Sequence, residues 1–189
     1  MKYLFAFILF LVIGGSSLYL YYVNSPYSKD TKRTIFGKLE SMTIKSSAFE
    51  NNGKIPSRYT CDGENVSPPF DFFTIPVAAK SLVLIVEDPD SPSKNFTHWI
   101  VFNINPLING FEENTIPDNS LEGLNDFGEP HYGGPCPNSG SHKYIFKLYA
   151  LNTYLNLEKG ATKQQVLNAL VGNIVEESQI TGVYERQRN

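Results

Sequence analysis

The sequence predicts an all-β domain with one short helix near its C-terminus. Its 11 tyrosines and 13 phenylalanines favour strands, and its 14 glycines and 12 prolines favour the turns between them. Three segments rich in β-branched and aromatic residues, at 81–87, 97–103 and 142–151, are bounded by Pro, Gly, Asn or Asp. Only the segment that begins at Thr162 has a convincing helical pattern.

Two of the predicted strands begin at a histidine. Because successive side chains of a strand point to opposite faces, residues two apart share a face. This alternation predicts two sets of residues with a shared face: His142, Tyr144, Phe146 and Leu148 in one strand, and His98, Ile100 and Phe102 in the other. Both histidines would then point the same way as apolar neighbours, which predicts a pocket at one end of the sheet.

The predicted helix has a clear N-terminal signal. Thr162 and Gln165 have the spacing of a capping box, in which each side chain binds the backbone N–H of the other. Apolar residues follow at helical spacing: Val166, Leu167, Leu170, Val171 and Ile174. Gly172 weakens the second half of this helix.

An apolar segment precedes the domain. Residues 1–23 carry no charge after Lys2, and the run from 3 to 23 is long enough to span a bilayer, which takes about 20 residues. Small residues at 14–17 partly fit a signal-peptide cleavage site instead. An uncleaved membrane anchor and a cleaved signal peptide therefore stay open. Both predict export to the periplasm or the extracellular space, with residues 24–38 as a linker and 39–189 as the domain.

Charge and motifs argue against several classes of function. The net charge of −3 lacks the basic balance expected of a nucleic-acid-binding protein. The sequence contains no G-x-S-x-G elbow, no phosphate-binding P-loop and no H-E-x-x-H zinc helix. The stretch 118–141 is rich in Gly and Pro, and a loop of that length in a compact domain usually has a function. We therefore expect a binding protein with no catalytic residues, no metal and no cofactor.

Several segments, taken in their order along the chain, resemble the phosphatidylethanolamine-binding protein family, in particular its bacterial and archaeal branch. They are RYTCDGENVSPP at 58–69, EDPDSP at 87–92, HWIVFNI at 98–104, YGGPCPNSGSHKYIFKLYAL at 132–151 and GVYERQRN at 182–189. The resemblance implies an antiparallel β-sandwich with a large central sheet and a small pocket at one end. It also implies a set of ligand-binding residues: Asp88, Asp90, Pro92, His98, Tyr132, Gly133, Gly134, His142 and Tyr144. The family commonly has Arg after the second histidine, where this chain has Lys143, a point charge without the planar fork.

The chemistry of these residues suits an anionic ligand such as phosphate or a phospholipid headgroup. Histidine and tyrosine side chains and the backbone N–H groups of a Gly-rich loop donate hydrogen bonds to an anion. A carboxylate beside a histidine fixes its tautomer and favours its protonated form. The residue types alone also allow a plainer reading, in which Asp88 and Asp90 bind their own backbone in a turn.

Three other functions stay open from the sequence. The resemblance extends to inhibitors, so an exported serine-protease inhibitor or another protein-interaction module is the main alternative. A hydrolase is a weaker one, because Ser139 or Ser141 with His142 and Asp88 are the residue types of a Ser–His–Asp triad. Two histidines with two aspartates are also metal-ligating types, although no short ligand spacing supports a metal.

The two cysteines, Cys61 and Cys136, lie in two of the resembling segments, which suggests that both lie near the pocket rim. If the domain is exported, its compartment permits disulfides, and two cysteines allow one intramolecular pairing. Two free, buried thiols are the alternative, as expected in cytosolic relatives with the same motifs.

Overall fold

The structure is a computed structural model that describes residues 40–186. The predicted anchor or signal peptide at 1–23 and the predicted linker at 24–38 lie outside the described residues. Within 40–186, no helix has both the length and the apolar character needed to cross a membrane.

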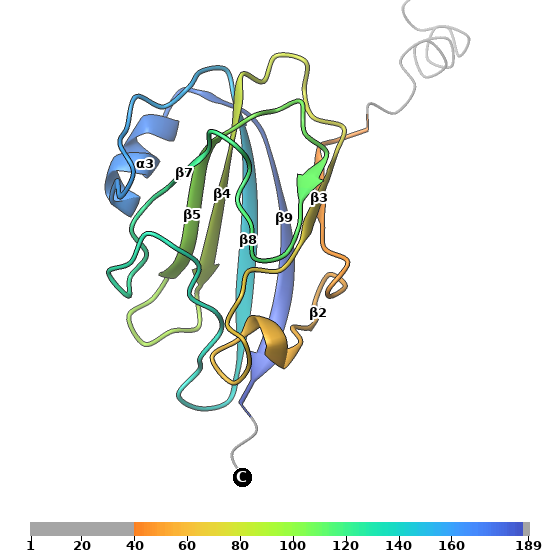
Figure 1. Ribbon diagram of the computed structural model, residues 1–189, viewed down its shortest axis with the longest axis vertical. Coiled ribbons are helices and arrows are strands. Elements are labelled where there is room, and N and C mark those ends of the chain that lie inside the picture. Colours follow the sequence, from red (N-terminus) through yellow and green to blue (C-terminus); the bar gives the residue numbers. More distant parts are fainter. Residues whose placement is uncertain (1–39, 187–189) are drawn as a thin grey trace, which may run out of the picture. The chain divides into compact units, whose positions relative to one another are not determined.

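Two β-sheets and one helix form the domain (Figure 1). The larger sheet has six strands, in the order β2 (Gly53–Lys54), β9 (Ile174–Glu185), β8 (Ser141–Leu151), β4 (Ser81–Asp88), β5 (Phe96–Ile104) and β7 (Leu121–Glu122). The smaller sheet has three strands, in the order β1 (Thr43–Lys45), β3 (Phe70–Phe73) and β6 (Gly110–Phe111). Helix α3 (Lys163–Leu170) and a 3₁₀ turn, η1 (Ser57–Tyr59), complete the secondary structure. The domain is thus mostly β with one short helix, as predicted.

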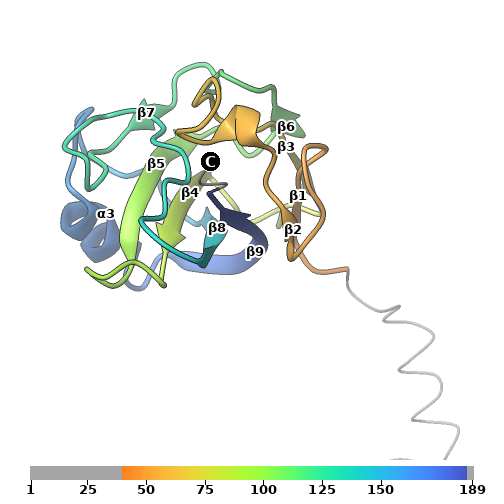
Figure 2. The ribbon, with the colours of Figure 1, turned by 90° about the horizontal axis from the view of Figure 1, so that it is seen from below.

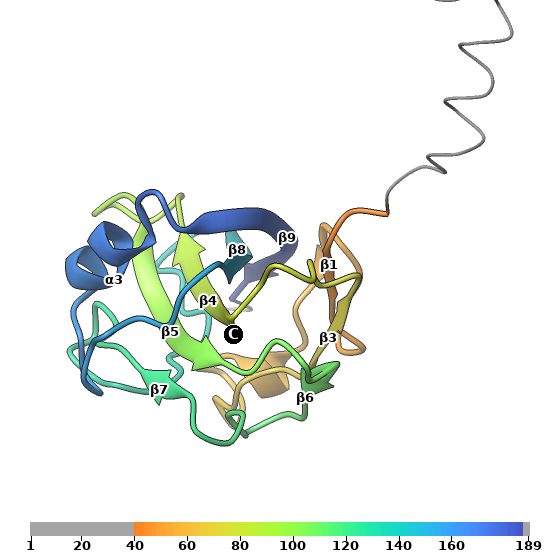
Figure 3. The same cartoon turned by 90° about the horizontal axis from the view of Figure 1, so that it is seen from above.

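The layers are the helix, the six-stranded sheet and the three-stranded sheet. Figures 2 and 3 show α3 on one face of the large sheet and β1, β3 and β6 on the other. The core between the two sheets includes Phe146, whose ring centroid lies 5.4 Å from that of Phe49 and 5.3 Å from that of Phe70. A second apolar cluster, which includes Ile85 and Ile100 of the sheet, packs beneath Val166 and Leu170 of the helix, among others. The large sheet is therefore covered on both faces over β4 and β5.

The three predicted central strands are confirmed with small changes at their ends. In β8 the predicted face is also confirmed, because Tyr144, Phe146 and Leu148 are buried while Lys143 is exposed. The predicted antiparallel arrangement is wrong at one pair, since β2 runs parallel to β9. These two strands are far apart in the sequence, so no tight hairpin connects them and either direction is open to them.

The predicted shared face of His98, Ile100 and Phe102 is wrong. The pairing of β4 with β5 shifts by one residue between Val86, opposite Trp99, and Glu87, opposite Thr97. His98 is the extra residue, and a bulge of this kind re-aims the side chains beside it. As a result Ile100 and Phe102 lie in the cluster under the helix. The His98 ring instead lies 5.1 Å from Tyr144, which belongs to the core between the sheets.

The capping box of α3 is confirmed, but the predicted extent of the helix is not. Thr162 and Gln165 make both hydrogen bonds of the box. The helix ends at Leu170, and Val171 is exposed while Ile174 begins β9. Gly172 has a φ of +76°, a left-handed conformation that terminates the helix at little steric cost.

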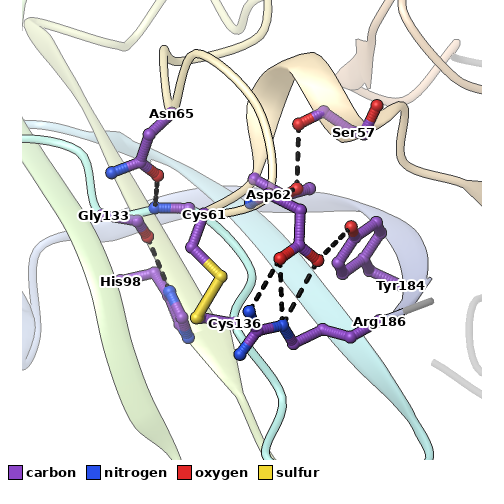
Figure 4. The surroundings of a disulfide bond; sticks show 11 residues. Ser57, Cys61, Asp62, Asn65, His98, Gly133, Cys136, Tyr184 and Arg186 are labelled. Carbon is purple, nitrogen blue, oxygen red and sulfur yellow. Dashed lines mark hydrogen bonds and ion pairs between the residues drawn. A yellow bond between two sulfur atoms is a disulfide. The ribbon is translucent and has the colours of Figure 1, made fainter. Parts of the chain in front are cut away.

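A disulfide joins two loops that are far apart in the sequence. Cys61, just after η1, is bonded to Cys136, 75 residues later, with the two Cα atoms 5.4 Å apart (Figure 4). The backbone N–H of Cys61 also donates to the carbonyl of Pro135 at 3.1 Å. Of the two thiol states that the sequence left open, the structure has the bridge.

Breaking this bridge is expected to destabilise the domain by about 4 kcal/mol, because a loop of this length regains its closure entropy in the unfolded chain. Denaturant unfolding of the oxidised and the reduced full-length chain measures the difference. Two alkylated thiols in the unreduced, denatured protein would contradict the bridge. A Cys61→Ser/Cys136→Ser variant serves as the control, since its stability is expected not to respond to reductant.

Candidate functional site

A pocket of about 290 Å³ opens where β4 ends and where β5 and β8 begin. Its lining combines polar side chains with two aromatic rings and the disulfide: Asp88, Ser91, Pro92, Phe96, His98, Phe127, Cys136, Pro137, Asn138 and His142. The end of a sheet suits such a site, because the strands fix the positions of the first and last residues while the loops stay free to vary.

Asp88, the last residue of β4, organises one wall of the pocket. Its Oδ1 accepts hydrogen bonds from the backbone N–H groups of Asp90 and Ser91 at 2.8 and 3.0 Å. Its Oδ2 accepts from Nδ1 of His142 at 2.7 Å. Since an ionised carboxylate only accepts, Nδ1 of His142 carries the proton. The nitrogen left for a ligand is therefore Nε2.

On the other side of the pocket, a protein acceptor fixes Nδ1 of His98 in the same way. Its Nδ1 lies 2.6 Å from the carbonyl oxygen of Gly133, as Figure 4 shows, and the N–H of Gly133 donates to the His98 carbonyl at 3.0 Å. A carbonyl only accepts, so Nδ1 of His98 is the protonated nitrogen of the neutral ring. Among the described residues, Nε2 of neither pocket histidine has a hydrogen-bond partner.

Aromatic rings surround His98. Phe96, Phe127 and Tyr144 meet it edge to face, with ring centroids 5.2, 5.5 and 5.1 Å away. Burial, the largest influence, lowers the pKa of His98 below its ordinary value, although the Gly133 carbonyl and the nearby Asp88 charge oppose the shift. In the free protein His98 is therefore neutral near pH 7.

Tyr144 lies buried beside His98 without lining the pocket. Its hydroxyl has no hydrogen-bond partner among the described residues. Burial raises the pKa of Tyr144 and the charge of Asp88 adds to the effect, so the hydroxyl stays protonated. The neutral Tyr144 hydroxyl therefore lies next to the His98 ring and is able to donate a hydrogen bond.

The structure divides the predicted ligand-binding residues into two groups. Asp88, Pro92, His98 and His142 line the pocket. The other five do not line it: Asp90, Tyr132, Gly133, Gly134 and Tyr144. Asp90 accepts from the backbone N–H of Lys143 at 2.8 Å, and Gly134 donates to Asn65 at 2.8 Å. The ligand-binding role of all nine stays a prediction.

Sequence reasoning missed the residues that form the aromatic side of the pocket. Phe127 lies in the Gly- and Pro-rich stretch, which was expected to be functional as a whole but gave no signal for one residue. Asn125 holds that loop, because its side chain donates to the carbonyl of His131 at 2.7 Å and accepts from the N–H groups of Phe127 and Glu129. A buried asparagine of this kind looks like any loop residue in the sequence.

Comparison with known proteins identifies the family of this fold. The family model described as phosphatidylethanolamine-binding protein matches residues 45–185. The chain belongs to this family. The relatives place it in the bacterial and archaeal branch. A UPF0098 protein of Methanothermobacter thermautotrophicus is 53% identical over 150 residues, which are 77% of this chain and 99% of that protein. A UPF0098 protein of Pyrococcus abyssi is 40% identical over 99% of this chain and 100% of its own.

Solved structures agree with this assignment. The crystal structure of a Chlamydia trachomatis protein described as a homologue in this family has a TM-score of 0.75 and 41% identity, and the match covers 78% of this chain and 99% of that one. E. coli YbcL, described as a member of the mammalian family, has a TM-score of 0.74 and 27% identity, over 78% of this chain and 100% of YbcL. Both resemblances support the fold.

The environment of His98 predicts its titration. The unfolded chain takes up a proton at this side chain near the ordinary pKa of 6.5, whereas the folded protein does so only at a lower pH. Between these two values the unfolded state binds more protons, so the free energy of unfolding falls as the pH drops below about 6.5. Imidazole ¹H–¹⁵N correlation spectra across pH 4–8 are expected to give a midpoint below 6.5 for His98, with the neutral ring protonated at Nδ1.

A His98→Gln variant assigns the resonance by its disappearance. A midpoint at or above 6.5, or a neutral ring protonated at Nε2, would show that the ring is not held as described.

Proposed function

We propose that the pocket binds a small anion, either phosphate itself or the phosphate of a phospholipid headgroup. The observation that carries this proposal is the matched orientation of the two pocket histidines. Each has its Nδ1 fixed by an acceptor in the protein, and each is left with Nε2 for the pocket. When both rings are protonated, they offer two charged N–H donors, which form the stronger class of hydrogen bond to phosphate oxygens.

The charge of Asp88 does not exclude an anion from this site. Both of its oxygens already accept hydrogen bonds, from two backbone N–H groups and from His142. Burial lowers the pKa of His98, and the negative charge of Asp88 opposes this shift and so favours the protonated ring. Neither Lys nor Arg is among the described residues that line the pocket, so positive charge comes from the imidazoles alone. Binding of the anion and uptake of a proton are therefore expected to go together.

The proposed role is binding without a chemical reaction. His142 and Asp88 form the acid–base pair of a hydrolytic triad, but a triad also needs a hydroxyl held by the histidine. Among the described residues, neither Ser139 nor Ser141 lines the pocket or hydrogen bonds to His142. This arrangement favours a ligand-binding protein over a hydrolase.

We also propose that the domain is exported and held at a membrane by residues 1–23. Support comes from the uncharged apolar run at 3–23 and from the disulfide, which is typical of oxidising compartments. The alignment with the Pyrococcus abyssi relative covers 99% of this chain, so it includes this segment.

Titration calorimetry with inorganic phosphate and with phosphoethanolamine tests the anion site in the full-length chain at pH 6. We expect His142→Ala to bind at least tenfold more weakly, because it loses one charge-assisted hydrogen bond, worth about 1.5–3 kcal/mol. His131→Ala is the matched control, since His131 is exposed and does not line this pocket. Equal affinities of wild type and His142→Ala for phosphate would refute the proposal, and a preference for phosphoethanolamine that His142→Ala abolishes would favour the headgroup over free phosphate.

Mass spectrometry of the protein from membrane and soluble fractions tests the location. The expected result is an intact N-terminus in the membrane fraction. A soluble mature form that begins near Ser17 or Asn24 would rule out the anchor but agree with export. Intact protein in the cytoplasm would rule out both.

A further inference from the structure

A second pocket, of about 300 Å³, lies against Glu122 of β7. The residues that matter most in its lining are Ser67, Trp99, Asn114, Thr115, Glu122 and Tyr132. It shares a loop with the anion pocket, because Tyr132 lines it while the next residue, Gly133, binds His98. None of the functions considered so far uses this second pocket.

Glu122 is a buried carboxyl group with no ion-pair partner in the described part of the chain. Only 8% of the residue is exposed, and its Oε1 accepts from the indole Nε1 of Trp99 at 2.8 Å. None of the ion pairs within residues 40–186 includes Glu122. One neutral donor compensates a buried carboxylate poorly, because charges removed from water usually need an opposite charge.

Glu87 shows how this protein treats an equally buried carboxylate. It is also 8% exposed, but two ammonium groups neutralise it, Lys147 and Lys163, each with Nζ 2.6 Å from a carboxylate oxygen. Although burial opposes the effect, these two lysines lower the pKa of Glu87 below its ordinary value. Glu87 has two lysine side chains beside its carboxylate, whereas Glu122 has a pocket beside its carboxylate.

The rest of the lining suits a cation with several N–H donors. Among the described lining residues there is no Lys, no Arg and no second carboxylate, and the one imidazole is that of the exposed His131. Hydroxyl and amide oxygens of Ser67, Thr115 and Asn114 are the acceptors that an ammonium group needs. The rings of Trp99 and Tyr132 belong to the residue types that attract cations. Within 40–186 no group of three or more His, Cys, Asp or Glu residues has the arrangement of a metal site.

We infer that this second pocket binds the ammonium group of a small organic amine, with Glu122 as its counter-ion. The amine replaces water around a carboxylate that is already buried, and it donates its remaining hydrogens to the polar wall. This site is distinct from the anion pocket, whose histidines would repel such a cation when they are protonated.

The protein contains its own reporter for this site. Trp99 is the only tryptophan of the chain, and it donates to Glu122. A cation at Glu122 alters the electric field at the indole, so the fluorescence of the full-length chain is expected to respond. Butylammonium chloride is the probe, and 1-butanol at the same concentrations is its uncharged counterpart, with sodium chloride added to match ionic strength.

We expect butylammonium to shift the Trp99 emission in a saturable way at millimolar concentrations, with no comparable response to 1-butanol. Glu122→Gln keeps an acceptor for Trp99 but removes the charge, and we expect it to weaken binding at least tenfold. Glu129→Gln is the matched control, because this exposed glutamate belongs to the same stretch of chain but lines neither pocket. Equal responses to butanol, or equal affinity in Glu122→Gln, would overturn the inference.

A measurement on the wild type covers the case in which Glu122→Gln does not fold. Backbone amide shifts on addition of butylammonium are expected at Ser67, Asn114 and Glu122. Shifts confined to Asp88 and His142 would place the cation at the other pocket and would overturn the inference.

Discussion

The candidate anion site depends on the carboxylate of Asp88. A carboxylate only accepts hydrogen bonds, and this one accepts three, from the N–H groups of Asp90 and Ser91 and from the ring of His142. It lies at the end of β4, between β5 and β8, so it ties the turn after its own strand to the first residues of β8. Without it, two backbone donors and one imidazole would lose their acceptor, and the wall that carries Pro92 would lose its position.

The opposite wall is irregular chain that hydrogen bonds to Thr97 and His98 of β5 and is held by further bonds. Irregular chain lacks the ladder of hydrogen bonds that fixes a sheet, so side chains and covalent links must satisfy and hold its backbone. Asn125 binds three backbone groups of the 125–131 loop, and Asn65 accepts from the N–H of Gly134. The Cys61–Cys136 bridge adds a covalent link to the same loop. Together these bonds keep the Gly133 carbonyl where it orients His98.

The pattern of neighbouring residues in the sequence predicted those parts of the fold that depend on short-range interactions. The three central strands, the buried face of β8 and the capping box of α3 follow from alternation and from short-range hydrogen bonds. The bulge at His98 could not be predicted in this way, because it arises from the pairing of β4 with β5 and not from the residues of one strand alone. The two glycines after Tyr132 were predicted to bind a ligand because of the family resemblance. Their closest hydrogen bonds go to protein groups, which only the fold brings together. Glu122 gave no signal at all, since a glutamate before a glycine in a long loop is usually exposed.

The loop between the two pockets joins the two sites for which we propose ligands of opposite charge. Tyr132 packs against Trp99 at 5.4 Å between ring centroids, and its hydroxyl donates to the carbonyl of Tyr59 at 2.8 Å. The following residue exchanges two hydrogen bonds with His98. Because the two residues are consecutive, a movement of Tyr132 in one pocket is expected to displace the carbonyl that sets the tautomer of His98 in the other. One short segment therefore contacts both sites: Tyr132 packs against the indole that donates to Glu122, and Gly133 orients His98.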